Sequence, residues 1–103
     1  MALEITTTTV EGGTIVAATG EVDVSCAAEL REAVNQAIDA GAAQVTVDLA
    51  EVPYIDSTGI GVLVGASHHA AETGSALKVV NPQRNVRRVL DMLGVTAELG
   101  IDA

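Results

Sequence analysis

The chain has 103 residues, the size of one domain, and its 14 acidic and 5 basic side chains give it a formal charge of −9. That charge repels nucleic-acid phosphates and anionic lipid surfaces, and no apolar run approaches the length of a membrane span, so we expect neither nucleic acid nor membrane as a partner. Hydrophobic residues make up 49% of the chain and aromatic residues only 1%, so the core must be built from Val, Leu, Ile and Ala, with Tyr54 as its single ring.

A hairpin of two antiparallel strands is predicted at the start of the chain. Residues 3–10 are rich in β-branched threonine, residues 11–13 supply a turn with two glycines, and residues 14–19 form a second β-branched run. The first four residues lack the basic and then apolar stretch of a secretory signal. We therefore expect a cytoplasmic protein.

A first helix is predicted after the hairpin. Ser25 is a favourable N-cap, apolar residues recur at helical spacing over residues 26–38, and Gly41 ends the helix. Cys26 is the only cysteine of the chain and cannot form an internal disulfide. A lone thiol suits a reducing compartment, which again favours the cytoplasm.

A buried strand and a second helix are predicted in the middle of the chain. Residues 45–49 alternate between apolar and polar side chains, as a strand with one face in the core requires. Asp56, Ser57 and Thr58 follow, and each has a side-chain oxygen that can cap a helix. We expect the second helix to begin at this trio and to end at Gly74.

A further strand and a third helix complete the predicted elements. Residues 76–80 are predicted to form another buried strand, and Asn81-Pro82 then opens a helix that Gly94 ends. Residues 96–103 have little apolar content, which argues against a final strand. The apolar stripe of the third helix consists of Val86, Val89, Leu90 and Leu93.

These elements predict a single α/β domain over residues 1–103. Helices between consecutive strands imply crossover connections, so the later strands should be parallel and the first two antiparallel. The expected architecture is a mixed four- to five-stranded β-sheet flanked by about three to four α-helices.

A catalytic site is not expected. The serine of a nucleophile elbow needs the pattern Gly-x-Ser-x-Gly, but Ile55 occupies the first glycine position before Ser57. The two histidines, His68 and His69, lie about 15 Å further along the same helix, out of reach of a triad, and neighbouring helix positions point too far apart for a metal site. Phosphate-loop and dinucleotide-binding patterns are also missing. We expect no enzyme activity, cofactor or metal.

The start of the second helix is the best candidate for a modification site. Free N–H groups and the positive end of the helix dipole can hold a phosphate on Ser57 without disruption of the fold. The alternative is that Asp56, Ser57 and Thr58 only cap the helix and have no other function. Three glycines follow, and each costs up to about 1 kcal/mol relative to alanine in a helix. Gly61 and Gly65, one turn apart, would let another backbone approach, either the sheet beneath or a partner protein.

Several segments resemble the STAS-domain anti-sigma factor antagonists, and the resemblance runs from Gly20 nearly to the end of the chain. Residues 20–23 are similar to the family's Gly-Glu-Leu-Asp segment and residues 55–63 to its Asp-Ser-Ser/Thr-Gly signature. Residues 79–95 resemble its closing strand and helix. The resemblance implies a STAS domain that acts by partner switching. In this mechanism the unmodified protein binds an anti-sigma factor and so frees a sigma factor.

The resemblance also implies roles for individual residues. The anti-sigma factor is usually a serine protein kinase, which would phosphorylate Ser57, and a PP2C-type phosphatase would restore the unmodified form. Asp23 and Asp56 would flank the switch, and Thr58 would support the helix start. The complete set of predicted switch and partner-binding residues is Asp23, Asp56, Ser57, Thr58, Gly59 and Gly61.

Other functions remain open. Some STAS proteins are non-phosphorylated scaffold subunits of transport or stress-signalling complexes, and nucleotide binding is attached to the family although no phosphate loop is present here. Arg84, Arg87 and Arg88 lie on the polar side of the third helix, either as a solvated face or as a contact for an acidic partner.

Overall fold

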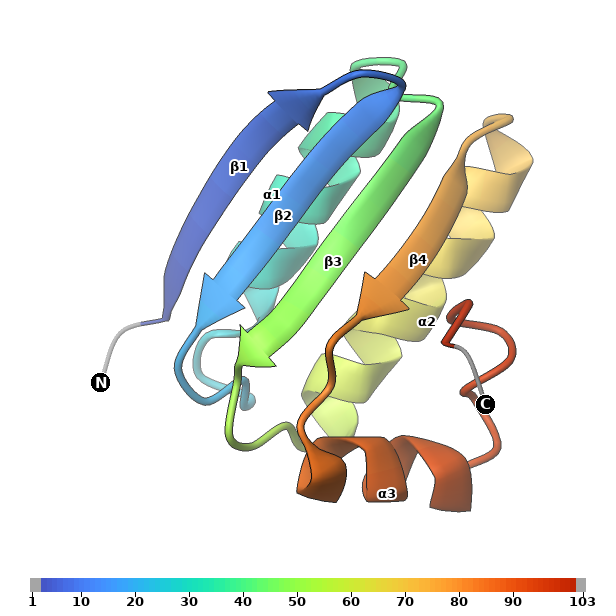
Figure 1. Cartoon of the computed structure of the whole chain (residues 1–103). Coiled ribbons are helices and arrows are strands. Elements are labelled where there is room, and N and C mark those ends of the chain that lie inside the picture. The colour runs from blue at the N-terminus through green and yellow to red at the C-terminus, as the bar shows by residue number, and fades with distance from the viewer. Residues whose placement is uncertain (1–2, 102–103) are drawn as a thin grey trace.

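The computed structural model describes residues 3–101 of the chain. In this part the predicted α/β domain is confirmed as a four-stranded mixed sheet with three helices (Figure 1). The elements are, in chain order, β1 (Glu4–Val10), β2 (Gly13–Thr19), α1 (Ala27–Asp39), β3 (Gln44–Glu51), α2 (Ser57–Glu72), β4 (Ala76–Val80) and α3 (Arg84–Met92). None of the described helices is long and apolar enough to cross a lipid bilayer.

The strands are arranged in the order β1-β2-β3-β4. β1 pairs with β2 in antiparallel register, whereas β2, β3 and β4 are parallel, as the sequence predicts. Parallel pairing brings the carboxyl ends of these three strands to one edge of the sheet (Figure 1). The connections that lead into α1, α2 and α3 therefore meet at that edge, which we call the carboxyl end.

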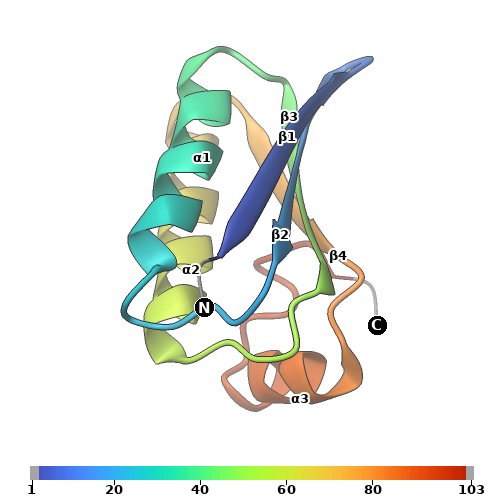
Figure 2. The same cartoon turned by 90° about the vertical axis from the view of Figure 1, so that its left-hand side faces the viewer.

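The core lies between the sheet and two helices. α1 and α2 cover the same face of the sheet, and α3 lies across the carboxyl end (Figure 2). Alternate residues of the strands point into this layer, and the core consists of aliphatic side chains, as the composition requires. Tyr54 does not join it, because its side chain is 49% exposed. Fully buried residues at the centre of the core include Val16, Leu30, Val34, Val47, Leu49, Leu63 and Val79.

The segment after α3 covers the free edge of β4. It contains no strand within the described residues, but the backbone N–H of Val79 donates to the carbonyl oxygen of Leu99 at 2.9 Å. The Leu99 side chain is completely buried. Val95 and Ile101 are partly buried against the same core, so three apolar side chains hold this segment against the domain.

Besides the placement of Tyr54, two further local predictions are wrong. Ser25 is not the N-cap of α1, because that position belongs to Cys26, which makes no side-chain capping bond, while the Ser25 hydroxyl donates to Asp23. The apolar stripe of α3 is only half used. Val86 and Leu90 are buried, but Val89 and Leu93 are 38% and 56% exposed, because α3 packs on the end of the sheet with one narrow face.

Candidate functional site

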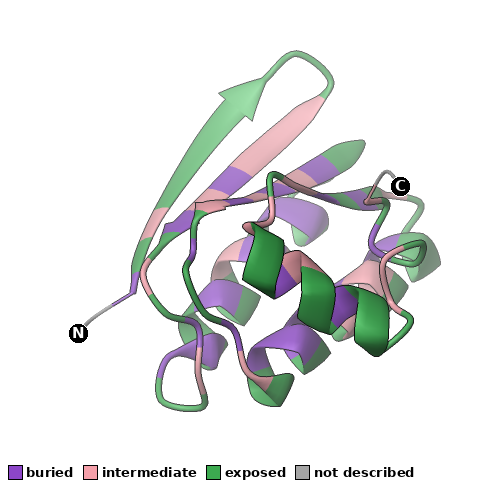
Figure 3. Ribbon diagram, turned by 60° about the horizontal axis from the view of Figure 1, so that its bottom comes forward, coloured by how far each residue is buried: buried purple, intermediate pink, exposed green. Residues whose placement is uncertain are grey.

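Two connections at the carboxyl end are bound to each other through their backbones. Val22 and Ile55 form an isolated parallel bridge. In this bridge the N–H of Val22 donates to the carbonyl oxygen of Tyr54 at 2.9 Å. The N–H of Asp56 donates to the carbonyl oxygen of Val22 at 3.1 Å. The β2–α1 and β3–α2 connections thus form one rigid surface, which faces the viewer together with α3 in Figure 3.

Asp56 is the N-cap of α2 and is one of the three residues that the sequence offered as possible caps. Its Oδ1 accepts the N–H of Gly59 at 3.1 Å, which satisfies one of the open donors of the first turn. Its Oδ2 accepts the N–H of Val24 at 3.2 Å. A single carboxylate therefore starts the helix and also holds the β2–α1 connection in place.

Ser57 and Thr58 are the first two residues of α2, and both are exposed. Within residues 3–101 neither backbone N–H finds an acceptor. These two donors lie at the positive end of the helix dipole, which attracts negative charge. Ser57 is thus an exposed residue at a place where an anion would be bound by the backbone.

Asp23 belongs to the same surface. Its Oδ1 accepts the Ser25 hydroxyl at 2.6 Å and the Ser25 N–H at 3.0 Å. These two hydrogen bonds, the hydroxyl one first, lower the pKa of the Asp23 carboxyl below its ordinary value. Asp23 and Asp56 therefore lie on two adjoining connections at the carboxyl end, and Asp23 is ionised at neutral pH.

Two exposed apolar side chains accompany these polar residues. Val24 is 76% exposed and follows Asp23, while Tyr54 is 49% exposed and precedes the cap residue by two positions. Both belong to the connections that the Val22–Ile55 bridge ties together. Exposed apolar groups beside polar ones are typical of protein-binding surfaces.

The glycines of α2 have different roles. Gly59 is buried, and a Cβ atom there would lie 2.7 Å from the Cγ1 atoms of both Val22 and Ile55, so the packing of the connections requires glycine. Gly61 and Gly65 are exposed, and a Cβ at either would have no neighbour within 4 Å. The sheet is therefore not what these two glycines make room for.

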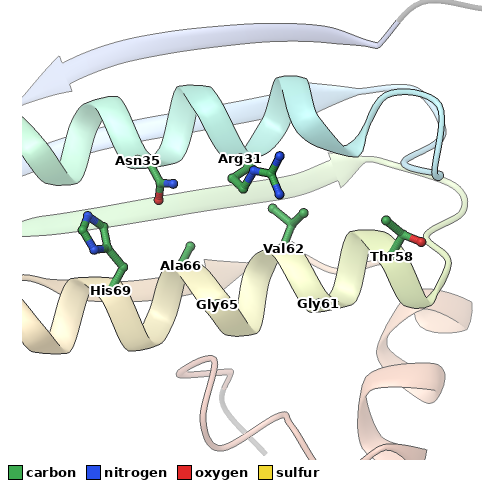
Figure 4. Close-up of a pocket in the computed structure, with 8 residues that line it drawn as sticks. All are labelled: Arg31, Asn35, Thr58, Gly61, Val62, Gly65, Ala66 and His69. Carbon is green, nitrogen blue, oxygen red and sulfur yellow. The ribbon is translucent and has the colours of Figure 1, made fainter.

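Gly61 and Gly65 line a groove of about 440 Å³ between α1 and α2 (Figure 4). Arg31 and Asn35, one turn apart on α1, reach toward α2 from the other wall. The Oδ1 atom of Asn35 is buried without a hydrogen-bond donor. The complete lining is Arg31, Asn35, Thr58, Gly61, Val62, Gly65, Ala66 and His69.

Thr58 connects this groove to the carboxyl end, because it lines the groove and adjoins Ser57 (Figure 4).

Sequence reasoning did not find Arg31 and Asn35. Their i, i+4 spacing on the polar side of α1 was the available signal, but the groove depends on how two helices pack.

The two histidines do not converge on a common site. His68 pairs with Glu98 of the C-terminal segment, whereas His69 Nε2 lies 2.7 Å from the Asp39 carboxylate at the end of α1. Cys26 is buried, and its Sγ lies 3.2 Å from the carbonyl oxygen of Glu21. The Cys26 Sγ also lies 3.5 Å from Oδ1 of Asp23, whereas the two histidines pair with carboxylates of other segments.

Comparisons with known proteins give consistent results. The family model of the STAS domain matches residues 4–103. The anti-sigma-B factor antagonist of Bacillus subtilis (strain 168) is 36% identical over 84 residues, which are 82% of this chain and 76% of the relative. A solved anti-sigma factor antagonist from Mycobacterium paratuberculosis has a TM-score of 0.87 at 19% identity, over 97% of this chain and 85% of that one.

The fold is also shared by SpoIIAA, an anti-sigma factor antagonist solved in two states. Its unphosphorylated form has a TM-score of 0.80 at 20% identity, over 97% of this chain and 89% of that one. The phosphorylated form, from Bacillus, has a TM-score of 0.72 at 18% identity, over 99% of this chain and 92% of that one.

Proposed function

The chain belongs to the STAS domain family, and we propose that it is an anti-sigma factor antagonist whose binding surface is switched by phosphorylation of Ser57. The names of its relatives support the first part, since the Bacillus subtilis protein is an anti-sigma-B factor antagonist. The unmodified chain would bind an anti-sigma factor and so free a sigma factor in the cytoplasm.

The observation that carries the proposal is the exposed Ser57 hydroxyl at the start of α2, beside two open backbone N–H groups. A kinase can reach this oxygen without local unfolding. The added phosphate can accept hydrogen bonds from the N–H groups of Ser57 and Thr58. The fold is then expected to survive modification, in keeping with the likeness of this chain to both the unphosphorylated and the phosphorylated SpoIIAA.

The partner would nevertheless be expelled. Phosphorylation adds about −1.5 to −2 charges at a surface where Asp23 and Asp56 are already present. A docked partner would have to desolvate this charge, and repulsion with desolvation amounts to several kcal/mol, where each ~1.4 kcal/mol is about tenfold in affinity. The switch needs no change in backbone conformation.

The remaining site residues support the same role. Asp56 and Thr58 would position the helix start, Gly59 would hold it close to the β2–α1 connection, and Gly61 would leave room for the partner. The chain itself contributes no catalysis in this scheme. The anti-sigma factor would be the serine protein kinase, and a PP2C-type phosphatase would remove the phosphate.

The test is incubation of the purified chain with candidate kinase-type anti-sigma factors of the same organism and Mg-ATP, followed by intact-mass measurement and site mapping. We expect the mass of one phosphate on Ser57 and none in Ser57→Ala. Binding should be retained by Ser57→Ala and lost by Ser57→Asp, while circular dichroism shows both variants folded. Equal binding by both variants would instead favour a constitutive scaffold subunit.

A further inference from the structure

A second exposed surface lies on α3, next to the connections that carry the switch. Three of the five basic residues of this acidic chain occur in this helix of nine residues. Arg87 lies 3.7 Å from Asp91, one turn away. Arg84 and Arg88 are exposed and form no ion pair within the described residues.

The two arginines without an ion pair lie beside exposed apolar side chains on the same helix. Arg84, Arg88 and Met92 follow one another at intervals of four residues and so form one stripe along the helix, and Met92 is 79% exposed. Asn85, Val89 and Leu93 form the neighbouring stripe at the same spacing. We call Arg84, Arg88, Val89, Met92 and Leu93 the α3 patch.

The α3 patch is rigidly attached to the switch. The Asn85 side-chain amide donates to the carbonyl oxygen of Pro53 at 2.7 Å, and Gln83 donates to that of Ala50 at 2.9 Å. Both acceptors precede the cap residue Asp56, because Ala50 lies near the end of β3 and Pro53 lies on the β3–α2 connection. Figure 3 shows the exposed side of α3 turned toward the viewer together with the start of α2.

Exposed apolar groups are concentrated at this end of the molecule. Of the six large hydrophobic side chains that are exposed in the described residues, only Val10 lies at the opposite end of the sheet. The other five are Val24, Tyr54, Val89, Met92 and Leu93. Such a concentration marks a protein-binding surface rather than a solvated helix face.

We propose that the α3 patch is a second docking element for the anti-sigma factor that binds at Ser57, and that it receives a segment of that partner which carries carboxylates and an apolar side chain. This inference rests on the proposed function. Charge complementarity identifies the occupant, because Arg84 and Arg88, which form no ion pair within the described residues, attract carboxylates and repel a basic segment. Methionine adapts its shape to an apolar side chain.

The docking surface then carries negative charge on one side and positive charge on the other. Its one side carries Asp23 and Asp56, and its other side carries Arg84 and Arg88. A partner with the opposite arrangement of charges can bind in one orientation only, which aligns its catalytic residues with the Ser57 hydroxyl. Complementary charges also accelerate the encounter at low salt.

The experiment measures the affinity of the anti-sigma factors of the same organism for the wild-type chain, Arg84→Glu/Arg88→Glu, Arg88→Glu, Lys78→Glu and Ser57→Asp. Arg88→Glu and Lys78→Glu change the net charge equally, but Lys78 lies on β4 and is not part of the α3 patch. We expect binding about tenfold or more weaker for the double variant, with a shallower salt dependence, and little change for Lys78→Glu.

The outcomes separate this inference from the proposed function. Loss of binding by Ser57→Asp together with unchanged binding by Arg84→Glu/Arg88→Glu overturns the α3 patch alone, as does an equal effect of Arg88→Glu and Lys78→Glu. Weaker binding by the arginine variants with no effect of Ser57→Asp supports the patch and overturns the switch. If no anti-sigma factor binds the wild-type chain, both are overturned.

Discussion

The N–H of Val24 donates to Oδ2 of Asp56 across 32 positions of sequence, while Oδ1 of the same carboxylate caps α2 through Gly59. One side chain therefore joins the helix start to the connection that carries Asp23. The switch surface is held together by this carboxylate and by the backbone bridge between Val22 and Ile55.

Substitution of Asp56 tests this double role. Asp56→Ala removes both hydrogen bonds, so we expect the free energy of unfolding to fall by about 1 to 2 kcal/mol in urea denaturation. Asp56→Asn keeps an oxygen for Gly59 and places an amide against the Val24 N–H, so its loss should be smaller. Equal losses in the two variants would show that the cap contributes nothing.

Gly59 and Gly61 provide a matched pair for stability. Gly59→Ala places a methyl group against Val22 and Ile55, and we expect it to destabilise the domain by about 1–3 kcal/mol. Gly61→Ala meets open space and should stabilise the helix by up to about 1 kcal/mol. Thermal and urea unfolding measure both. Changes of the same sign in the two variants would contradict the packing described here.

The groove between α1 and α2 predicts an effect on binding that is separate from stability. A partner that uses the space above Gly61 and Gly65 should be hindered by Gly61→Leu, which fills the groove from an exposed position of the folded chain. We expect about tenfold weaker binding of the anti-sigma factor with an unfolding transition no lower than that of the wild type. Unchanged affinity would place the partner outside the groove.

The lowered pKa of Asp23 has a measurable cause. Ser25→Ala removes the first of the hydrogen bonds that hold it down, so the pKa of Asp23 should rise in that variant when its side-chain carboxyl is titrated by NMR. The pKa of Asp23 is lower in the folded chain than in the unfolded chain. The carboxylate therefore stabilises the fold fully when the pH is above the unfolded-state pKa, and this contribution is lost as the pH falls through the folded-state pKa. Identical titration midpoints would contradict this origin.

The start of α2 was predictable because its signals are local. Asp56 precedes two further capping residues and then an apolar run, and no distant residue is needed to recognise that pattern. The antiparallel start and parallel continuation of the sheet followed from the lengths of the connections. The resemblance of residues 55–63 to a family signature then pointed to Ser57.

The wrong or missing predictions depend on contacts between distant segments. Serine is a residue type that often caps helices, but the hydroxyl of Ser25 donates to the nearby Asp23 carboxylate instead. Val89 and Leu93 follow helical spacing, yet the end of the sheet is too narrow to bury them. Arg31 and Asn35 became site residues only when α1 packed beside α2.

The contact between Val79 and Leu99 has a consequence for self-association. A bare sheet edge is a template for strand addition, and here the C-terminal segment occupies the edge of β4. Only β1 remains at the other edge of this sheet. Strand-to-strand pairing between two molecules through β1 uses up the open edge of each, so it ends at a dimer and does not propagate into a fibre.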